Sequence, residues 1–276
     1  MQPQARLNDL NAMSKRMRLN IIKLAYQVGN NGAHIAPALS CNEIIAVLYG
    51  DVMNLNPKNP VSQERDRFLI GKGHGALALY AALCDTGFFS EELLFTYQKN
   101  GGDLPGQPSM NLSLGIEVSS GSLGNALSVG EGIALSAKKN GDKYKTYVLL
   151  GDGECNEGTI WETAMSASHF RLDNLIAIVD LNGMQSDGQS AKILNMGNFR
   201  EKWSSFGWNV IEADGHDIES LYNAFHAIKQ ERKPTVILAH TIKGHGVSFM
   251  ENNNSWHHNH LSSEQYELAL SELEAK

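Results

Sequence analysis

The sequence predicts an α/β protein with a doubly wound parallel sheet flanked by helices. Short apolar segments alternate with segments of helical periodicity through the middle of the chain, and this alternation is typical of parallel βαβ units. The short segments are apolar on both faces, as expected for strands of a sheet that is covered on both sides. With 276 residues, the chain is long enough for one large buried core. We therefore expect a single domain over residues 1–276.

The strands are expected where aliphatic and β-branched residues cluster in short runs. These runs are residues 67–70, 144–150, 175–181, 208–212 and 235–239. Ligands of open α/β sheets bind beyond the carboxyl ends of the strands. The functional loops are therefore expected after Ile70, Leu150, Asp180 and Ala239.

The helices are expected where apolar residues recur every three or four positions. They are residues 7–28, 41–49, 76–83, 124–139, 157–170, 198–206 and 217–229. Asp217 stands immediately before the last of these segments, where its side chain can cap the helix.

Composition excludes several classes of partner and location. The net charge is −7 and the basic residues are scattered, so neither nucleic acid nor an acidic membrane surface is an expected partner. Cys41, Cys84 and Cys155 are far apart and odd in number, which argues against a disulfide framework. Residues 1–20 lack the apolar core of a signal peptide, and the apolar runs are too short to span a membrane. We expect a cytoplasmic protein.

The loop after Leu150 reads Gly151-Asp152-Gly153-Glu154. The glycines let the backbone turn sharply and approach a ligand closely. Asp152 offers the hard oxygen that Mg²⁺ prefers. A helix expected to follow would direct its N-terminal amides at a diphosphate.

The loop after the next strand contains Asn182 and Met184. The Asn182 side chain and the Met184 carbonyl can supply further oxygens to the same ion. Gly-Asp-Gly and Asn-Gly are each common as plain turns. Their combination at the ends of neighbouring strands favours a metal–diphosphate site.

Residues 151–162 and 180–188 together resemble the transketolase family. The likeness extends from about residue 30 to residue 257 and covers only the diphosphate-binding half of an ordinary transketolase. It implies an enzyme that moves a two-carbon ketol group from a ketose to an aldose with thiamine diphosphate and Mg²⁺. Ca²⁺ or Mn²⁺ is expected to substitute for Mg²⁺.

The resemblance assigns roles to the two loops. Asp152, Asn182 and the Met184 carbonyl would bind Mg²⁺, and Gly151, Gly153 and Glu154 would lie beside the diphosphate. Glu157 and Glu162 match family glutamates at an interface between subunits. The alternative for both is a solvated residue of a helix face, and for Glu157 neither interpretation is favoured.

Two further segments match the cofactor-binding loops of the family. Gly121, Ser122 and Leu123 correspond to a loop beside the thiazolium ring, with Ser122 where the family has proline. Ser122 could instead be a helix N-cap. Lys243 matches a loop near the diphosphate and would add a positive charge there.

Three histidines match the substrate channel of the family. They are His34, His74 and His257, of which His74 and His257 would also contact the cofactor. Ala33 and Ala36 replace glycines that are common around the first histidine. Neutral imidazoles can exchange protons with substrate hydroxyls near pH 7. A histidine is more often an ordinary structural residue, and His257 competes with its neighbours His258 and His260 for the match.

A fourth family histidine is replaced here by Gln107, within Leu104-Pro105-Gly106-Gln107-Pro108. An amide can hydrogen-bond to a hydroxyl but cannot carry a proton at pH 7. We therefore expect an unusual donor or acceptor.

The glutamate that activates the cofactor in this family lies on a pyrimidine-binding domain, which we expect this chain to lack. That domain, with the residues that bind sugar phosphates, is expected on a separate partner chain in a heterotetramer, and the substrates would be sugars or sugar phosphates. Two rival interpretations stay open at this point. One is the α chain of a 2-oxo acid dehydrogenase or decarboxylase, and the other is a paralogue that binds the cofactor without turnover.

Overall fold

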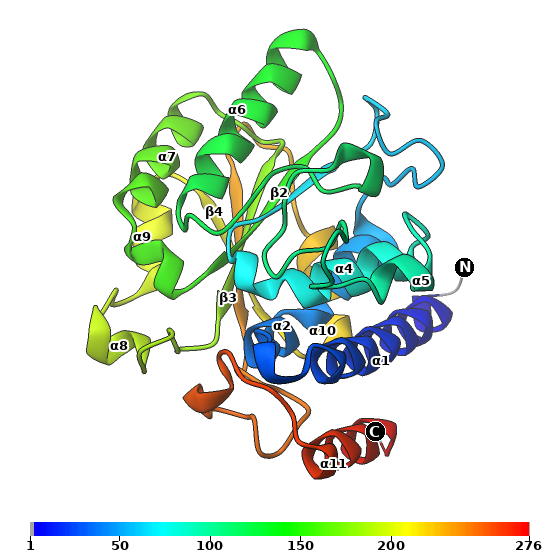
Figure 1. The fold of residues 1–276 in the computed structure, drawn as a ribbon. Helices are drawn as coiled ribbons and strands as arrows, with labels where there is room; N and C mark the ends of the chain where they lie inside the picture. The colour runs from blue at the N-terminus through cyan, green and yellow to red at the C-terminus, as the bar shows by residue number, and fades with distance from the viewer. Residues whose placement is uncertain (1–2, 276) are drawn as a thin grey trace.

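The computed structural model describes residues 3–275, whose five parallel strands form one sheet with helices on both faces (Figure 1). Each neighbouring pair of strands is parallel, which confirms the predicted fold class. The order across the sheet is β1 (Arg67–Ile70), β2 (Thr146–Gly151), β3 (Leu175–Leu181), β5 (Thr235–His240) and β4 (Asn209–Asp214).

The α-helices agree with the predicted segments within a few residues, apart from the differences described below. They are α1 (Pro3–Gln27), α2 (Ile35–Ser40), α3 (Asn42–Val47), α4 (Ala76–Asp85), α5 (Glu91–Leu94), α6 (Asn125–Asn140), α7 (Gly158–His169), α8 (Ser190–Ile193), α9 (Phe199–Ser205), α10 (Ile218–His226) and α11 (Ser263–Glu274).

Two hydrophobic cores lie on opposite faces of the sheet. Alternate residues of a strand point to opposite faces, so Tyr147 and Leu149 enter one core while Val148 and Leu150 enter the other. The first core contains α1 to α4, α10 and α11, and the second contains α6, α7 and α9. These two groups of helices lie on opposite sides of the sheet in Figure 1. The double covering explains why the central strands carry so little charge.

Strand β4 differs from the prediction that every strand is apolar on both faces. It is one of the two edge strands, and Glu212 and Asp214 are exposed along it. An edge strand has a neighbour on one side only, so polar residues are tolerated there. Asp217 caps α10 as predicted, accepting a hydrogen bond from the Glu219 amide. The Ser122 cap is wrong, because the N-cap of α6 is Gly124.

The prediction missed four helices, α2, α5, α8 and α11. Helix α2 contains Pro37 in its first turn. Proline has no N–H group, but an N–H in the first turn has no acceptor within the helix, so no helical hydrogen bond is lost. Helix α11 begins with a capping box between Ser262 and Gln265. The helix expected over 41–49 is shorter as α3 and continues as a π-helical turn, Leu48–Val52.

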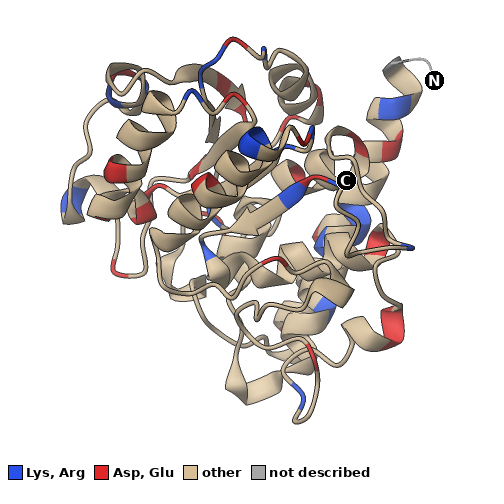
Figure 2. Cartoon of the chain, turned by 90° about the horizontal axis from the view of Figure 1, so that it is seen from above, with Lys and Arg blue, Asp and Glu red and all other residues tan. Residues whose placement is uncertain are grey.

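Charged residues of both signs are interspersed over the ribbon (Figure 2). Among residues 3–275, no helix combines the length and apolar character that crossing a membrane requires.

Candidate active site

A cavity of about 230 Å³ lies beyond the carboxyl ends of β1, β2, β3 and β5, where the loops were expected to meet. Ten of the residues predicted for the site line it: His74, Leu123, Gly151, Asp152, Gly153, Glu154, Asn182, Met184, Lys243 and His257. Residues from separate loops therefore meet in one place, as the strand-end argument predicts.

Asp152 and Asn182 present oxygens at the ends of β2 and β3. The Asp152 carboxylate is buried, accepts a hydrogen bond from the Gly153 amide at 2.9 Å and another from Ser190 Oγ at 2.8 Å. Burial raises the pKa of Asp152. The Asn182 amide donates to Ser40 Oγ at 3.1 Å, and its Oδ1 accepts from the Met184 amide at 3.0 Å.

The residues at this point fit a magnesium ion. No group of three or more His, Cys, Asp and Glu side chains able to hold a metal occurs within residues 3–275. An ion held here would therefore depend on one carboxylate, one amide oxygen and a main-chain carbonyl. Mg²⁺ suits such a site because it usually keeps phosphate and water oxygens in its shell.

A buried ion pair supports the cavity, and the sequence analysis gave it no role. Lys72 follows β1 and pairs with Asp180 at the end of β3. Burial opposes the charge on Lys72, but the Asp180 carboxylate raises the Lys72 pKa above its ordinary value. Asp180 also accepts from Ser40 Oγ at 2.8 Å. A lysine between two glycines at a strand end was a signal that could have identified it.

Lys243 is the second buried cation of the cavity. Its ammonium donates to the Gln185 carbonyl at 3.0 Å and to Asn254 Oδ1 at 2.7 Å. Burial, with a smaller contribution from the charge on Lys72, lowers the Lys243 pKa to about 8. Its hydrogen bonds are to neutral oxygens, so an anion entering the cavity would meet a positive charge.

Glu154 joins three loops beneath the cavity. Its carboxylate accepts from the Gly124 amide at 2.9 Å and from the Gly151 amide at 3.0 Å. A Cβ on Gly71 would lie 2.3 Å from Glu154 Oε1, so only glycine fits there. Burial raises the Glu154 pKa to about 7.

The three predicted channel histidines form a cluster beside the cavity. The ring centroids of His34, His74 and His257 are 5.3 to 6.0 Å apart. Burial lowers the pKa of His34 to about 4 and that of His257 to about 3, and it lowers the pKa of His74 well below 6.5. All three rings are therefore neutral at pH 7.

His257 and its neighbours differ in their position relative to the cavity. His257 lines the cavity, and its Nδ1 is buried without a hydrogen-bond partner among the described residues. His258 does not line the cavity but packs edge-on against His34, with ring centroids 4.6 Å apart. His260 is exposed. An antiparallel bridge between Ala33 and Asn259 holds the two histidine segments together.

Four predicted residues do not line the cavity. They are His34, Gln107, Gly121 and Ser122. Gln107 is exposed, and a Cβ on Gly121 would lie 2.2 Å from its Oε1. Gly121 also has a φ of +130°, which side chains disfavour. Glycine is therefore required here both by the backbone conformation and by the lack of space for a Cβ. Gln107 thus packs beside the loop that carries Leu123.

Of the two predicted interface glutamates, Glu157 is the N-cap of α7 and Glu162 lies within this helix. Glu157 lines the cavity, whereas Glu162 does not. The hydrophobic side chains of Leu123, Val129 and Met165 are exposed on the loop before α6, on α6 and on α7.

Comparison with known proteins identifies the family. Residues 13–273 match the family described as "Transketolase, thiamine diphosphate binding domain". The chain is 40% identical to a subunit of the apulose-4-phosphate transketolase of Phocaeicola vulgatus, over 97% of its own length and 94% of the relative. It is 41% identical to 6-deoxy-6-sulfo-D-fructose transketolase subunit SqwG of a Clostridium species, covering 90% and 91% of the two chains.

Solved transketolases have the same fold over part of their length. The transketolase from Leishmania mexicana superposes with a TM-score of 0.88 at 26% identity, over 96% of this chain and 41% of that one. The chain thus spans about two fifths of that transketolase. The matches favour the transketolase interpretation over a 2-oxo acid dehydrogenase. The chain belongs to the transketolase family, as its thiamine-diphosphate-binding domain.

Proposed function

We propose that this chain is the cofactor-binding component of a two-chain transketolase and that the enzyme transfers a two-carbon ketol group from a ketose to an aldose. The observation that carries the proposal is the meeting of Asp152, Asn182, Lys243 and the histidines around one cavity. Relatives that the chain covers almost completely are themselves named as subunits of transketolases.

Residues at the carboxyl ends of β2 and β3 would hold the metal and the diphosphate. Asp152, Asn182 and the Met184 carbonyl would bind Mg²⁺, and Lys243 would face the diphosphate charge. Thiamine diphosphate, when bound, supplies the electron sink that lets a carbon–carbon bond be cleaved and formed. Gly151, Gly153 and Glu154 would let the backbone approach the diphosphate, while Gly121, Ser122 and Leu123 would pack on the ring side.

The histidines would act on the substrate. His34, His74 and His257 are neutral at pH 7 because burial lowers their pKa values. A neutral ring can accept a proton from a substrate hydroxyl at one nitrogen or donate one from the other. Gln107 can orient a hydroxyl but not move a proton, so it would affect substrate choice.

The partner would supply the pyrimidine-binding domain, and one domain over residues 1–276 would supply the rest. The exposed apolar side chains of Leu123, Val129 and Met165 give a surface that such a chain could cover. Buried polar atoms of Ser120 and Thr159 in the same region have no hydrogen-bond partner among residues 3–275. Glu157 and Glu162 would lie in this interface of a heterotetramer.

The three cysteines are free, which suits the reducing cytosol in which we place the enzyme.

The test is to recover the tagged chain from its own cell extract with Mg²⁺ and thiamine diphosphate, and then to sequence what accompanies it. A stoichiometric partner that restores ketol transfer would support the proposal. An active lone chain would refute the two-chain part of it. Pyruvate decarboxylation without ketol transfer would favour the dehydrogenase interpretation, and cofactor binding without turnover would favour the non-catalytic paralogue.

A further inference from the structure

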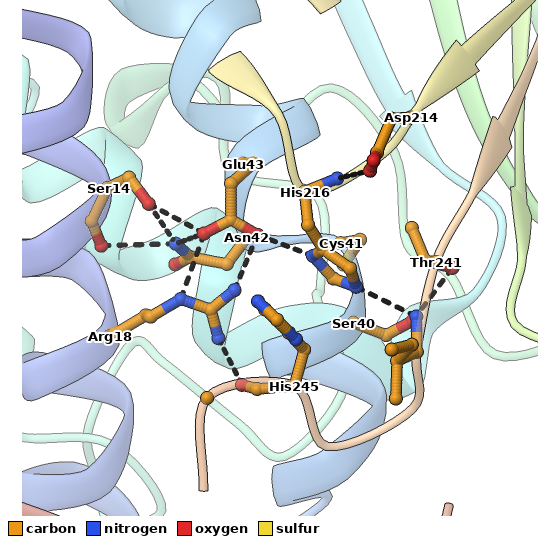
Figure 3. Close-up of polar contacts among 12 residues, drawn as sticks. Ser14, Arg18, Ser40, Cys41, Asn42, Glu43, Asp214, His216, Thr241 and His245 are labelled. Carbon is orange, nitrogen blue, oxygen red and sulfur yellow. Dashed lines mark hydrogen bonds and ion pairs between the residues drawn. The ribbon is translucent and has the colours of Figure 1, made fainter. Parts of the chain in front are cut away.

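A polar network that includes Arg18, Glu43 and His216 (Figure 3) contacts the chain segment that carries Lys243. The segment is residues 242–245, between β5 and the 3₁₀ turn Asn254–Trp256. Gly244 in it has a φ of +81°, and a Cβ there would lie 2.3 Å from the Met250 carbonyl. The segment therefore follows a path that glycine alone permits. Main-chain hydrogen bonds hold its middle, from the Gly244 amide to the Ala36 carbonyl and from the Asn252 amide to the Lys243 carbonyl, and side chains hold its two ends.

His216 binds the first end of the segment. Its Nε2 accepts a hydrogen bond from the Ile242 amide at 2.8 Å. A ring nitrogen that accepts from an amide carries a lone pair, so the proton of the neutral ring is on Nδ1. That Nδ1 lies 2.9 Å from Glu43 Oε2 and donates to it. The loop between β4 and α10, which carries His216, is thereby linked to α3.

Arg18 binds the other end of the segment. Its Nη1 donates to the His245 carbonyl, while Nε and Nη2 donate to the two carboxylate oxygens of Glu43. The His245 ring stacks on the His216 ring, with centroids 3.7 Å apart. Both ends of the segment are therefore connected to the same carboxylate.

Glu43 is buried and remains charged. Burial alone would raise its pKa, but the Arg18 guanidinium and the His216 hydrogen bond hold the pKa well below its usual range. Ser14 Oγ also donates to it at 2.7 Å, and Asn42 Nδ2 at 3.1 Å. A carboxylate with this many donors forms a rigid point of attachment.

We propose that Glu43, acting through His216 and Arg18, is a positioning residue that keeps the Lys243 ammonium inside the cavity. The inference rests on the proposed function in one respect, namely that Lys243 would contact the diphosphate of the cofactor. An alternative is that the network merely stabilises the fold. The two differ in whether losing one arm releases Lys243 alone or loosens the whole domain.

The experiment removes the His216 arm and measures how fast an amine-reactive acylating reagent modifies Lys243 in the full chain without cofactor. His216→Phe retains a ring to stack on His245 but neither hydrogen bond. Lys72 is an internal reference, because it is equally buried and its ammonium bonds to Asp180 and the Pro37 carbonyl rather than to the partners of Lys243. Glu117→Gln is the matched control variant, since it weakens the buried ion pair with Arg65 at the opposite end of the sheet.

We expect His216→Phe to speed the labelling of Lys243 by about 10-fold, the effect of losing the one hydrogen bond that His216 makes to this segment, while Lys72 labelling is unchanged. Glu117→Gln should leave the ratio of the two rates as in the wild type. Equal acceleration of both lysines, or acceleration of neither, would overturn the inference.

A second measurement links the network to the cofactor. Affinity for thiamine diphosphate with Mg²⁺ is compared for His216→Phe, Lys243→Met and the double variant, with the partner chain present. If His216 acts through Lys243, the double variant binds no more weakly than Lys243→Met alone. Additive losses would contradict the inference. No loss in Lys243→Met would instead count against the proposed function, while the labelling result would stand.

Discussion

The two ends of the sheet both bury charge, yet they differ in what surrounds it. At the amino end, Arg65 pairs with Glu117, and the Arg67 guanidinium lies 4.7 Å from the ring centre of Tyr144. Asp66 accepts from the Lys145 amide at 2.7 Å. These charges are matched with each other, with an aromatic ring or with main-chain donors.

At the carboxyl end, Lys72 and Asp180 form a similar ion pair, but further groups face a cavity. Lys243 bonds only to neutral oxygens in the contacts described above, and His257 Nδ1 has no partner among residues 3–275. Buried charge by itself therefore does not mark a functional site. In this protein the candidate site is distinguished by cationic and imidazole groups that surround a cavity without anionic partners.

The largest expected effect concerns the ion pairs at the two ends. Lys72→Met should destabilise the chain by about 3–5 kcal/mol, because it leaves the Asp180 carboxylate buried without a cationic partner. Arg65→Met should destabilise it less, because the Arg67 guanidinium still lies 3.8 Å from the Glu117 carboxylate. Urea unfolding followed by tryptophan fluorescence measures the loss. When cofactor binding is measured on the folded fraction of each variant, only Lys72→Met should bind the cofactor more weakly than the wild type. The double variant Lys72→Met/Asp180→Leu should regain most of the stability without regaining the cofactor, and recovery of both would break the comparison.

Asp152→Ala should weaken cofactor binding in the presence of Mg²⁺ by more than about 100-fold, since even outer-sphere partners of a metal contribute about 10–100-fold. Calorimetric titration of the complex measures this change. Asp66→Asn, at the amino end, is the control and should bind the cofactor as the wild type does. If the wild type binds the cofactor equally well in excess EDTA, the proposed metal site is wrong.

A smaller effect is expected from pH. Folding lowers the pKa of His34 from 6.5 to about 4 and that of His257 to about 3, so below pH 6.5 the unfolded chain binds more protons. Their contribution to stability is complete above pH 6.5 and is lost as the pH falls towards 3–4. A His34→Asn/His257→Asn variant should therefore show a shallower dependence of unfolding free energy on pH in this window. Parallel curves would mean that these rings are solvated.

The smallest effect is expected at Gln107, which is exposed. Gln107→His should change the ratio of kcat/KM values between two ketose donors by a few-fold, within the roughly 10-fold range that one hydrogen bond provides. Stability should not change, because no buried group is affected. An unchanged donor profile would show that this position does not select the substrate.

Much of the site followed from sequence because its signals are local. Gly151-Asp152-Gly153 lies at the end of one strand, and Asn182 directly follows the next one, so strand ends alone brought them together. The prediction that Ser122 caps a helix was wrong because it used a local signal alone. A serine near a helix start is a common cap, and only the backbone shows that α6 begins from Gly124.

Contacts between distant segments could not be predicted in this way. Lys72 and Asp180 are 108 residues apart, and Glu43 and His216 are 173 apart. Neither pair has a periodic or spacing signal. Each depends on which strands become neighbours and on how α3 packs beside the loop that follows β4.

The sequence by itself determined the parallel sheet, the cavity at its carboxyl end and the position of the oxygens that we propose as metal ligands, because strand periodicity and glycine loops act over a few residues. Only the tertiary structure decided which charges are paired, which histidine faces the cavity and what holds Lys243 in place. Those properties depend on burial and on partners from remote segments, since a pKa or a hydrogen bond is set by the surroundings of a group rather than by its neighbours in the chain.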